Sequence, residues 1–327
     1  AKSYSSPIEN YLTGVDVTAD GSIIFTGRTT VNPDNIIRQV IGKTSGNGSL
    51  QWVKEILTGN DSIFTRGIKI FNTVDGGFAT TGSGGKKISL LKFNSTGNLA
   101  SAKLFEGPAY SSSPIGKQTN DGGFIITGTT FASVAGYTDY TYLLKTDSSG
   151  NMEWSKKYAE EYVGDVLQDA SGGFIITGGS NAVPNSTNPF GLNLFILKTN
   201  NQGIVQWRKY YRSNELTHEM GNSISSTMNN GLLVYGTAQG NTHYTYLLKT
   251  NANGDLPCNG YDYTLGDSPY LLTEQSANYT VSNIGYVTSD MALDEIISNY
   301  TKTNLCLNDI DELSNHDLMI YPNVLAL

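Results

Sequence analysis

Residues 121–128 read Asp-Gly-Gly-Phe-Ile-Ile-Thr-Gly, a turn-forming Asp-Gly-Gly followed by an apolar run, a threonine and a final glycine. Related versions of this octapeptide occur five times in the chain. They begin at Asp20, Asp75, Asp121, Ser171 and Asn229. Self-similarity at a period of roughly 50 residues decides the architecture, because each repeat is one structural unit that packs on its neighbours.

A second set of markers recurs at fixed distances inside each repeat. An apolar run ends in a lysine, and a glycine follows five residues later. The lysines are Lys43, Lys92, Lys145, Lys198 and Lys249, and the glycines are Gly48, Gly97, Gly150, Gly203 and Gly254. Three repeats place a tryptophan four residues past the glycine, at Trp52, Trp154 and Trp207. We interpret the lysines as scaffold residues at strand edges, whose stems cover apolar surface while the ammonium groups reach water.

The segments between these markers are predicted to be strands. They are short runs of Ile, Phe, Leu, Val, Thr and Tyr bounded by Asp-Gly, Asn-Gly or Ser-Gly, whereas a helix needs roughly ten or more periodic residues. Apolar runs without alternation, such as 124–126 and 194–197, indicate sheets that are covered on both faces. Four antiparallel strands per repeat with both faces buried are typical of a β-propeller blade.

We therefore expect an all-β protein, a β-propeller of six four-stranded antiparallel blades, with five or seven blades as alternatives. The propeller would span residues 1–306, with five clear repeats in 14–263. An irregular last blade over 264–306 would be completed by residues 1–5, so that the N-terminal strand closes the ring. Residues 307–327 would form a linker and a tail.

The repeats resemble a known family in their motifs. Three motifs in succession are similar to the repeats of secreted Bacteroidota β-propeller proteins. They are Asp-Gly-Gly-Phe-Ile-Ile-Thr-Gly, Tyr-Leu-Leu-Lys-Thr-Asp at 142–147 and Gly-Asn-Met-Glu-Trp-Ser-Lys at 150–156. Leu-Met-Ile-Tyr-Pro-Asn at 318–323 is similar to the opening strand of a type IX secretion C-terminal sorting domain, although Val324 replaces the usual second proline. The resemblance implies export to the cell surface or the medium, and Ser62 in Asp-Ser-Ile looks like an O-glycosylation site of the same bacterial group. It implies no activity, because the repeats define a scaffold.

Composition excludes several classes of partner. The net charge is −8 and no Lys/Arg cluster occurs, so neither nucleic acid nor an anionic membrane surface is expected as a partner. No apolar run approaches the roughly 20 residues of a membrane-spanning helix, so we expect no membrane insertion. Cys258 and Cys306 lack metal-ligand spacing, and we expect a disulfide between them, with two buried free thiols as the alternative. No metal ion or cofactor is expected.

Candidate ligand-binding residues lie in the long connections that differ between repeats. Successive hairpins place these connections at one end of every sheet and the short repeated turns at the other, and function concentrates on variable loops held by a rigid scaffold. Aromatic rings beside Asn, Asp and His side chains suit a sugar or a peptide ligand. The candidates are Tyr110, Tyr137, Asp139, Tyr140, Phe190, His218, His243 and Tyr244.

Three functions remain open from the sequence. The first is a non-enzymatic extracellular binding or adhesion module for a glycan or a surface protein, and the second is a self-associating subunit of a surface layer or filament. The third is a polysaccharide-degrading enzyme, which needs paired carboxylates or a histidine cluster. His218 and His243 could meet as metal ligands or an acid/base pair, but exposed loop histidines are the alternative, and we interpret Glu215 and Glu219 as part of a solvated acidic rim. No catalytic residue is assigned.

Overall fold

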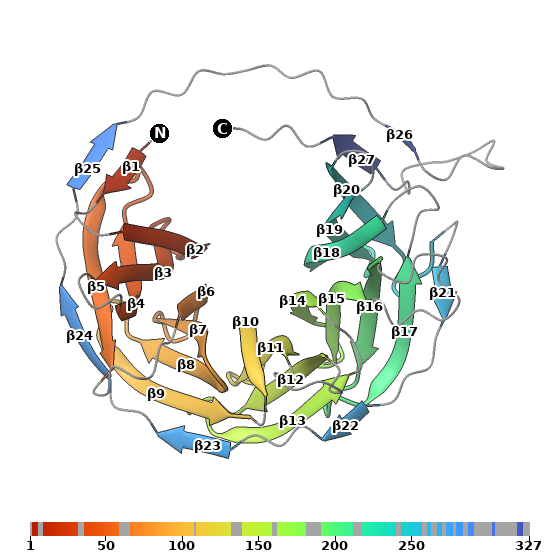
Figure 1. The fold of residues 1–327 in the computed structure, drawn as a ribbon, viewed down its shortest axis with the longest axis horizontal. Coiled ribbons are helices and arrows are strands. Elements are labelled where there is room, and N and C mark those ends of the chain that lie inside the picture. The colour runs from red at the N-terminus through yellow and green to blue at the C-terminus, as the bar shows by residue number, and fades with distance from the viewer. Residues whose placement is uncertain are drawn as a thin grey trace. The chain divides into compact units, whose positions relative to one another are not determined.

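The computed structural model describes most of the first 256 residues and seven short strands that follow them. The described ranges are 2–5, 9–31, 36–58, 66–107, 109–131, 139–158, 162–180, 191–211, 217–239 and 243–256, and then strands β21 to β27. All regular secondary structure in these ranges is β-strand (Figure 1). Among these residues there is no helix long and apolar enough to span a membrane.

Each repeat forms one antiparallel sheet with its strands in chain order. The first sheet is β2 (Glu9–Val17), β3 (Ile23–Val31), β4 (Ile36–Thr44) and β5 (Leu50–Thr58). The second is β6 (Arg66–Asn72), β7 (Phe78–Gly84), β8 (Lys87–Phe93) and β9 (Leu99–Glu106). The third is β10 (Tyr110–Gln118), β11 (Phe124–Phe131), β12 (Tyr140–Thr146) and β13 (Met152–Tyr158). The fourth is β14 (Tyr162–Gln168), β15 (Phe174–Ser180), β16 (Asn193–Thr199) and β17 (Val205–Tyr211), and the fifth begins with β18 (Thr217–Ser226), β19 (Leu232–Gln239) and β20 (His243–Thr250). The predicted all-β fold of four-stranded, antiparallel propeller blades is confirmed.

The second and third strands of the second, third and fourth repeats are buried on both faces over most of their length, as their unbroken apolar runs predict, whereas β19 and β20 of the fifth repeat alternate between buried and less buried residues. Every residue of β15 is buried, and β16 is buried except at Lys198. The outer strand β13 is only partly buried and alternates at its start, because one of its faces meets solvent.

The first strand of every sheet carries a β-bulge near its recurring glycine. In the second half of the chain this glycine permits a close approach between neighbouring sheets. A Cβ atom at Gly164 would lie 1.9 Å from the carbonyl oxygen of Gly221, so no other residue fits there.

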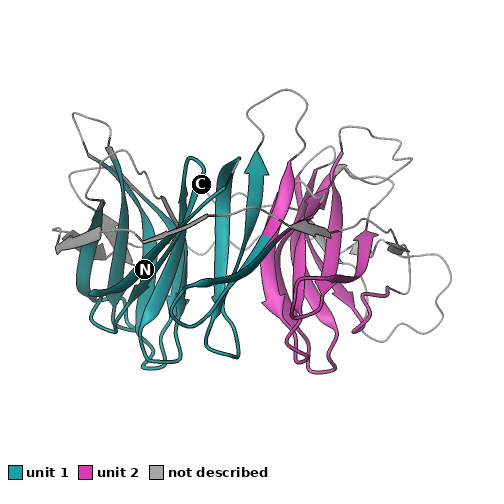
Figure 2. Cartoon of the chain, turned by 90° about the horizontal axis from the view of Figure 1, so that it is seen from below, with its two compact units in different colours: residues 1–137, 143–155, 270–295 teal, residues 138–142, 156–269, 296–327 magenta. Residues whose placement is uncertain are grey.

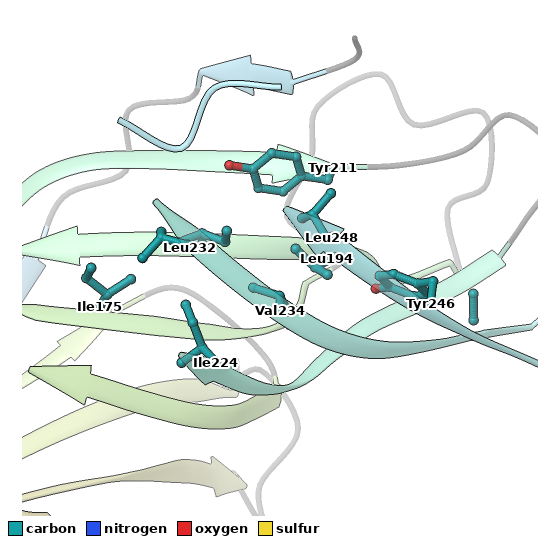
Figure 3. Packing of buried hydrophobic residues seen from close by; sticks show 10 residues of the cluster. Ile175, Leu194, Tyr211, Ile224, Leu232, Val234, Tyr246 and Leu248 are labelled. Carbon is teal, nitrogen blue, oxygen red and sulfur yellow. The ribbon is translucent and has the colours of Figure 1, made fainter. Parts of the chain in front are cut away.

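The chain divides into two compact units (Figure 2). Unit 1 comprises residues 1–137, 143–155 and 270–295, and unit 2 comprises residues 138–142, 156–269 and 296–327. In unit 1, the core between the first and second sheets consists of Ile24, Ile41, Ile56, Ile70, Phe78, Leu91 and Phe93. In unit 2, the fourth and fifth sheets bury a cluster drawn in Figure 3, which consists of Ile175, Leu194, Ile196, Tyr211, Ile224, Leu232, Val234, Ala238, Tyr246 and Leu248.

The strands that follow residue 256 differ from the expected last blade. Four of them each extend the outer edge of a different sheet: β21 (Gly260–Asp262) pairs with β17, β22 (Asp267–Pro269) with β13, β23 (Thr273–Ser276) with β9 and β24 (Tyr279–Asn283) with β5. Only β25 (Val287–Asp290) pairs with the N-terminal strand β1 (Lys2–Ser5). This region lacks the Asp-Gly turns that fold the repeats into hairpins, whereas each outer strand offers unpaired N–H and C=O groups to an extended segment.

The sequence predicts that residues 307–327 form a linker and a tail, but part of this segment pairs with the fifth sheet. Strand β27 (Met319–Pro322) pairs with β20 as the fourth strand of the fifth sheet, and β26 (Thr303–Asn304) pairs with β27. The fifth repeat lacks the Trp-x-Lys motif of an outer strand, which leaves the edge of β20 open for this segment. The predicted disulfide between Cys258 and Cys306 and the predicted modification of Ser62 stay untested, because these three residues lie outside the described residues.

Candidate functional site

Every hairpin sheet has two chemically different ends. The turn end holds the short turns between the first and second strands and between the third and fourth strands. The loop end holds the remaining connections, and the predicted ligand-binding residues that the structure describes lie at or near the strand ends there.

A carboxylate with three donors closes the turn of the second sheet. Asp75 accepts hydrogen bonds from the Thr73 hydroxyl at 2.5 Å and the Gly77 amide at 3.2 Å, and its other oxygen lies 2.8 Å from Lys92 Nζ. Because Lys92 and Thr73 donate to the ionised carboxyl, the pKa of Asp75 is lowered to about 2. We call this Thr-Asp-Lys arrangement the turn clamp. It recurs as Thr18-Asp20-Lys43 and Thr119-Asp121-Lys145.

The fourth sheet keeps the turn clamp with two residues exchanged. Asp169 stands at the threonine position and Ser171 at the aspartate position, and the Ser171 hydroxyl donates to Asp169 at 2.6 Å. Lys198 Nζ lies 2.9 Å from the same carboxylate. Four of the recurring lysines are therefore committed to neutralising a carboxylate in their own turn.

The Trp-x-Lys motif fastens each sheet to the next turn. In unit 2, the Tyr211 hydroxyl donates to the Gly254 carbonyl at 2.6 Å, Lys209 pairs with Asp255, and the Trp207 ring lies against Gly254. In unit 1, Lys54 Nζ donates to the Thr96 carbonyl and to Asn98 Oδ1, and the Trp52 ring lies against Gly97. The fixed spacing of the repeat is thus explained by contacts between adjacent sheets.

Two predicted ligand-binding residues lie at the loop ends of the first and third strands of the third sheet. Tyr110 begins β10 and is 48% exposed. Tyr140 begins β12, is partly buried, and has Lys157 Nζ 4.5 Å from its ring centroid. Asp139 immediately precedes it and is partly buried. The predicted residues Tyr137 and Phe190 lie outside the described residues.

The other predicted residues gather at the loop end of the fifth sheet. His243 pairs with Gln239, which pairs in turn with Thr217, so strand β19 separates His243 from His218. Both histidines are exposed, while Tyr244 is partly buried against the core of unit 2. Within the described part of the chain, no group of three or more His, Cys, Asp or Glu side chains could hold a metal ion.

A strained bulge next to these histidines places a carboxylate inside the protein. His218 has a φ of 54°, in the left-handed region, between the paired residues Thr217 and Met220. The following Glu219 is 5% exposed, and its amide donates to the Leu192 carbonyl at 3.0 Å. Glu219 is therefore buried and does not belong to a solvated rim.

Tyr246 is a buried residue that sequence reasoning missed. It is 4% exposed, and its hydroxyl has no hydrogen-bond partner among the described residues. Burial raises the pKa of Tyr246 well above its usual value, and the charge of Glu219 raises it further. Its cross-strand partner is Gly236, whose missing side chain leaves room for the ring.

Two exposed tyrosines at loop ends were also missed. Tyr11 on β2 is 46% exposed, with the Arg28 guanidinium 4.7 Å from its ring centroid, and Tyr162 at the start of β14 is 37% exposed. Each tyrosine pairs with the residue directly after the last glycine of the repeated octapeptide: Tyr11 pairs with Arg28, and Tyr162 pairs with Gly179. This shared register is a signal in the repeat that points to both.

The chain was compared with known proteins. No family model and no curated protein matches it. Among solved structures, a protein of unknown function from Bacteroides caccae is similar over 79% of this chain and 83% of its own length, with 14% sequence identity and a TM-score of 0.47.

Proposed function

We propose that the protein is an extracellular or cell-surface, non-enzymatic binding module that holds a glycan or a surface protein at the loop ends of its sheets. The observation that carries this proposal is the chemical difference between the two ends of a sheet. In four of the five sheets the lysine and the carboxylate at the turn end pair with each other in the turn clamp, whereas the loop end exposes tyrosine and histidine side chains.

Two loop-end rings, the exposed Tyr11 and the partly buried Tyr140, have a cation beside them. Arg28 lies over Tyr11 in unit 1, and Lys157 lies over Tyr140 in unit 2. A ring held by a neighbouring cation loses little freedom on binding, and its flat face with adjacent donors suits a sugar ring or a peptide. The location outside the cell rests on the resemblance of the repeats to secreted proteins.

One observation supports the alternative, a self-associating structural subunit. The outer strands β5 and β9 of unit 1 each pair with an added strand, β24 and β23, so these edges are able to accept an extended segment. Strand addition of this kind is a common route to assembly between copies.

A screen against immobilised glycans and cell-surface proteins tests the proposal. The full chain is compared with the variant Tyr162→Ala/His218→Ala, which removes two exposed loop-end side chains of unit 2, and with Val74→Ala, which removes an apolar side chain that is 87% exposed at a turn. Saturable binding that the double variant weakens at least tenfold and Val74→Ala leaves unchanged supports the proposal. Equal binding by all three proteins, or none at high micromolar concentration, overturns it.

A further inference from the structure

The fifth repeat keeps the backbone of the turn clamp. The Thr227 amide donates to the Gly231 carbonyl at 2.8 Å and the Asn230 amide to the Thr227 carbonyl at 3.0 Å, as in the other four turns. Lys249 pairs across the sheet with Leu233, in the register that Lys92 has with Ala79 in the second sheet. The threonine and the lysine of the clamp are therefore both in place.

The carboxylate of the clamp is missing from this turn. Asn229 stands where the second turn has Asp75, and the threonine position holds Thr227, so neither of the two places that supply a carboxylate elsewhere is acidic. Within the described ranges, the side chains of Thr227, Asn229 and Lys249 make no hydrogen bond or ion pair. The neutral amide thus does not take over the part of the aspartate.

The other turns show what this set of donors binds. In the third turn the Asp121 carboxylate receives the Thr119 hydroxyl at 2.5 Å, the Gly123 amide at 2.9 Å and Lys145 Nζ at 2.9 Å. The matching donors in the fifth turn are the Thr227 hydroxyl, the Gly231 amide and Lys249 Nζ. A hydroxyl, an amide and an ammonium that converge on one point recognise a carboxylate through charge-assisted hydrogen bonds.

Charge and exposure make this turn accessible to an external group. The lysine of each clamped turn pairs with at least one carboxylate, and Lys145 pairs with both Asp121 and Glu153, whereas Lys249 has no carboxylate partner among the described residues. Asn229 and Asn230 are exposed, and Met228 is fully exposed beside them. An apolar side chain next to an uncompensated cation suits an acidic group carried on a larger molecule.

We propose that the turn of the fifth sheet is a binding site for a carboxylate that comes from outside the chain. Thr227 and the Gly231 amide hold one oxygen, Lys249 neutralises the charge, and Met228 contacts the molecule that carries the carboxyl group. The carboxylate belongs either to an acidic peptide side chain or to a uronic acid of a glycan. The site is at the turn end of its sheet, so it does not depend on the proposed loop-end binding.

Amide NMR of the full chain tests this site with two probes, N-acetyl-aspartyl amide and glucuronate, titrated at constant ionic strength against sodium chloride. Either probe should produce saturable shifts at Gly231 and Thr227. A response to only one probe identifies the source, and equal responses show that the carboxylate alone is recognised. Absence of a saturable shift with both probes overturns the proposal.

Three variants distinguish the site from general anion binding. Asn229→Asp places a carboxylate in the turn and should abolish the response, and Lys249→Gln should weaken it at least tenfold. Asp75→Asn empties the clamp of the second turn and should create the same response at Gly77. If Asn229→Asp binds both probes as the wild type does, the proposal is wrong.

Discussion

The same chemical change is predicted to have opposite effects on stability at two buried tyrosines. The Tyr211 hydroxyl donates to the Gly254 carbonyl at 2.6 Å, whereas the Tyr246 hydroxyl has no partner among the described residues. Both side chains are at most 4% exposed and belong to one core cluster of unit 2. Each is therefore replaced by phenylalanine, which removes one oxygen atom and leaves the ring.

Tyr211→Phe should lower the free energy of unfolding by about 1–3 kcal/mol, because it loses a buried hydrogen bond and leaves the Gly254 carbonyl unsatisfied. Tyr246→Phe should leave the free energy of unfolding unchanged or raise it by up to about 1–2 kcal/mol, because it removes a buried polar group that has no partner. The repeats show that phenylalanine fits both places, since Phe105 and Phe195 occupy the equivalent positions of the second and fourth repeats.

Equilibrium unfolding in urea at pH 7 measures both variants against the wild type. The comparison uses midpoints at equal m-values, so that a change in the unfolded state is not read as a lost contact. A Tyr246→Phe variant as destabilised as Tyr211→Phe would refute the reasoning, since it would show that the Tyr246 hydroxyl is satisfied. A Tyr211→Phe variant as stable as the wild type would refute the role given to the fastening between sheets.

Two further predictions concern the turn ends. The pKa values of Asp75 and Asp121 are lowered to about 2 in the folded protein from 3.8, so their stabilisation is complete above about pH 4 and is lost as the pH falls towards 2. Both carboxylates are more than half exposed, so each should contribute only about 0.5–1 kcal/mol to the free energy of unfolding. The drop in urea midpoint from pH 5 to pH 3 should therefore be smaller in an Asp75→Asn/Asp121→Asn variant than in the wild type, with the remaining drop due to carboxyls such as Asp169 whose pKa is also lowered, and equal drops would contradict the role of the two clamps. Gly76→Ala should lower the free energy of unfolding by about 1–2 kcal/mol, because φ is 78° there, although a Cβ atom would meet nothing within 4 Å. Gly254→Ala should lower the free energy of unfolding by at least about 1 kcal/mol more, because φ is 75° there and the Cβ atom would also lie 2.8 Å from the Trp207 ring. Thermal unfolding of the two variants measures this difference. Equal losses of stability would contradict the packing of the tryptophan on this turn.

The repeated residues made the sheets predictable. Asp-Gly turns and lysine-terminated runs recur at constant spacing, so the four strands of each of the first four repeats and the first three strands of the fifth follow from sequence alone. Contacts that change from one repeat to the next were harder to foresee. The Asp169 and Ser171 exchange preserves the turn clamp only because both positions point at one lysine, which is a property of the folded turn.

The loop ends and the C-terminal strands were the least predictable parts. The bulge at His218 shifts the in–out alternation of β18, so Glu219 is buried although its neighbours in sequence are polar. The separation of His218 from His243 by a whole strand depends on pairing, not on sequence distance. The strands after residue 256 are not joined by the Asp-Gly turns of the repeats and pair with edges made by distant parts of the chain, so local patterns do not identify their partners.

Amide hydrogen exchange on the native full-length chain compares four of the five turns directly. The amides of Gly76, Gly122 and Gly172 donate to turn carbonyls in clamped turns, and the Asn230 amide makes the same hydrogen bond in the turn that lacks a carboxylate. If the turn clamps fix the turn ends, then after correction for intrinsic rates the three glycine amides exchange about fivefold more slowly than Asn230, which corresponds to about 1 kcal/mol. Equal protection at all four amides would show that the backbone alone holds the turns, and would contradict the role given to the turn clamps in fixing the turn ends of the other sheets.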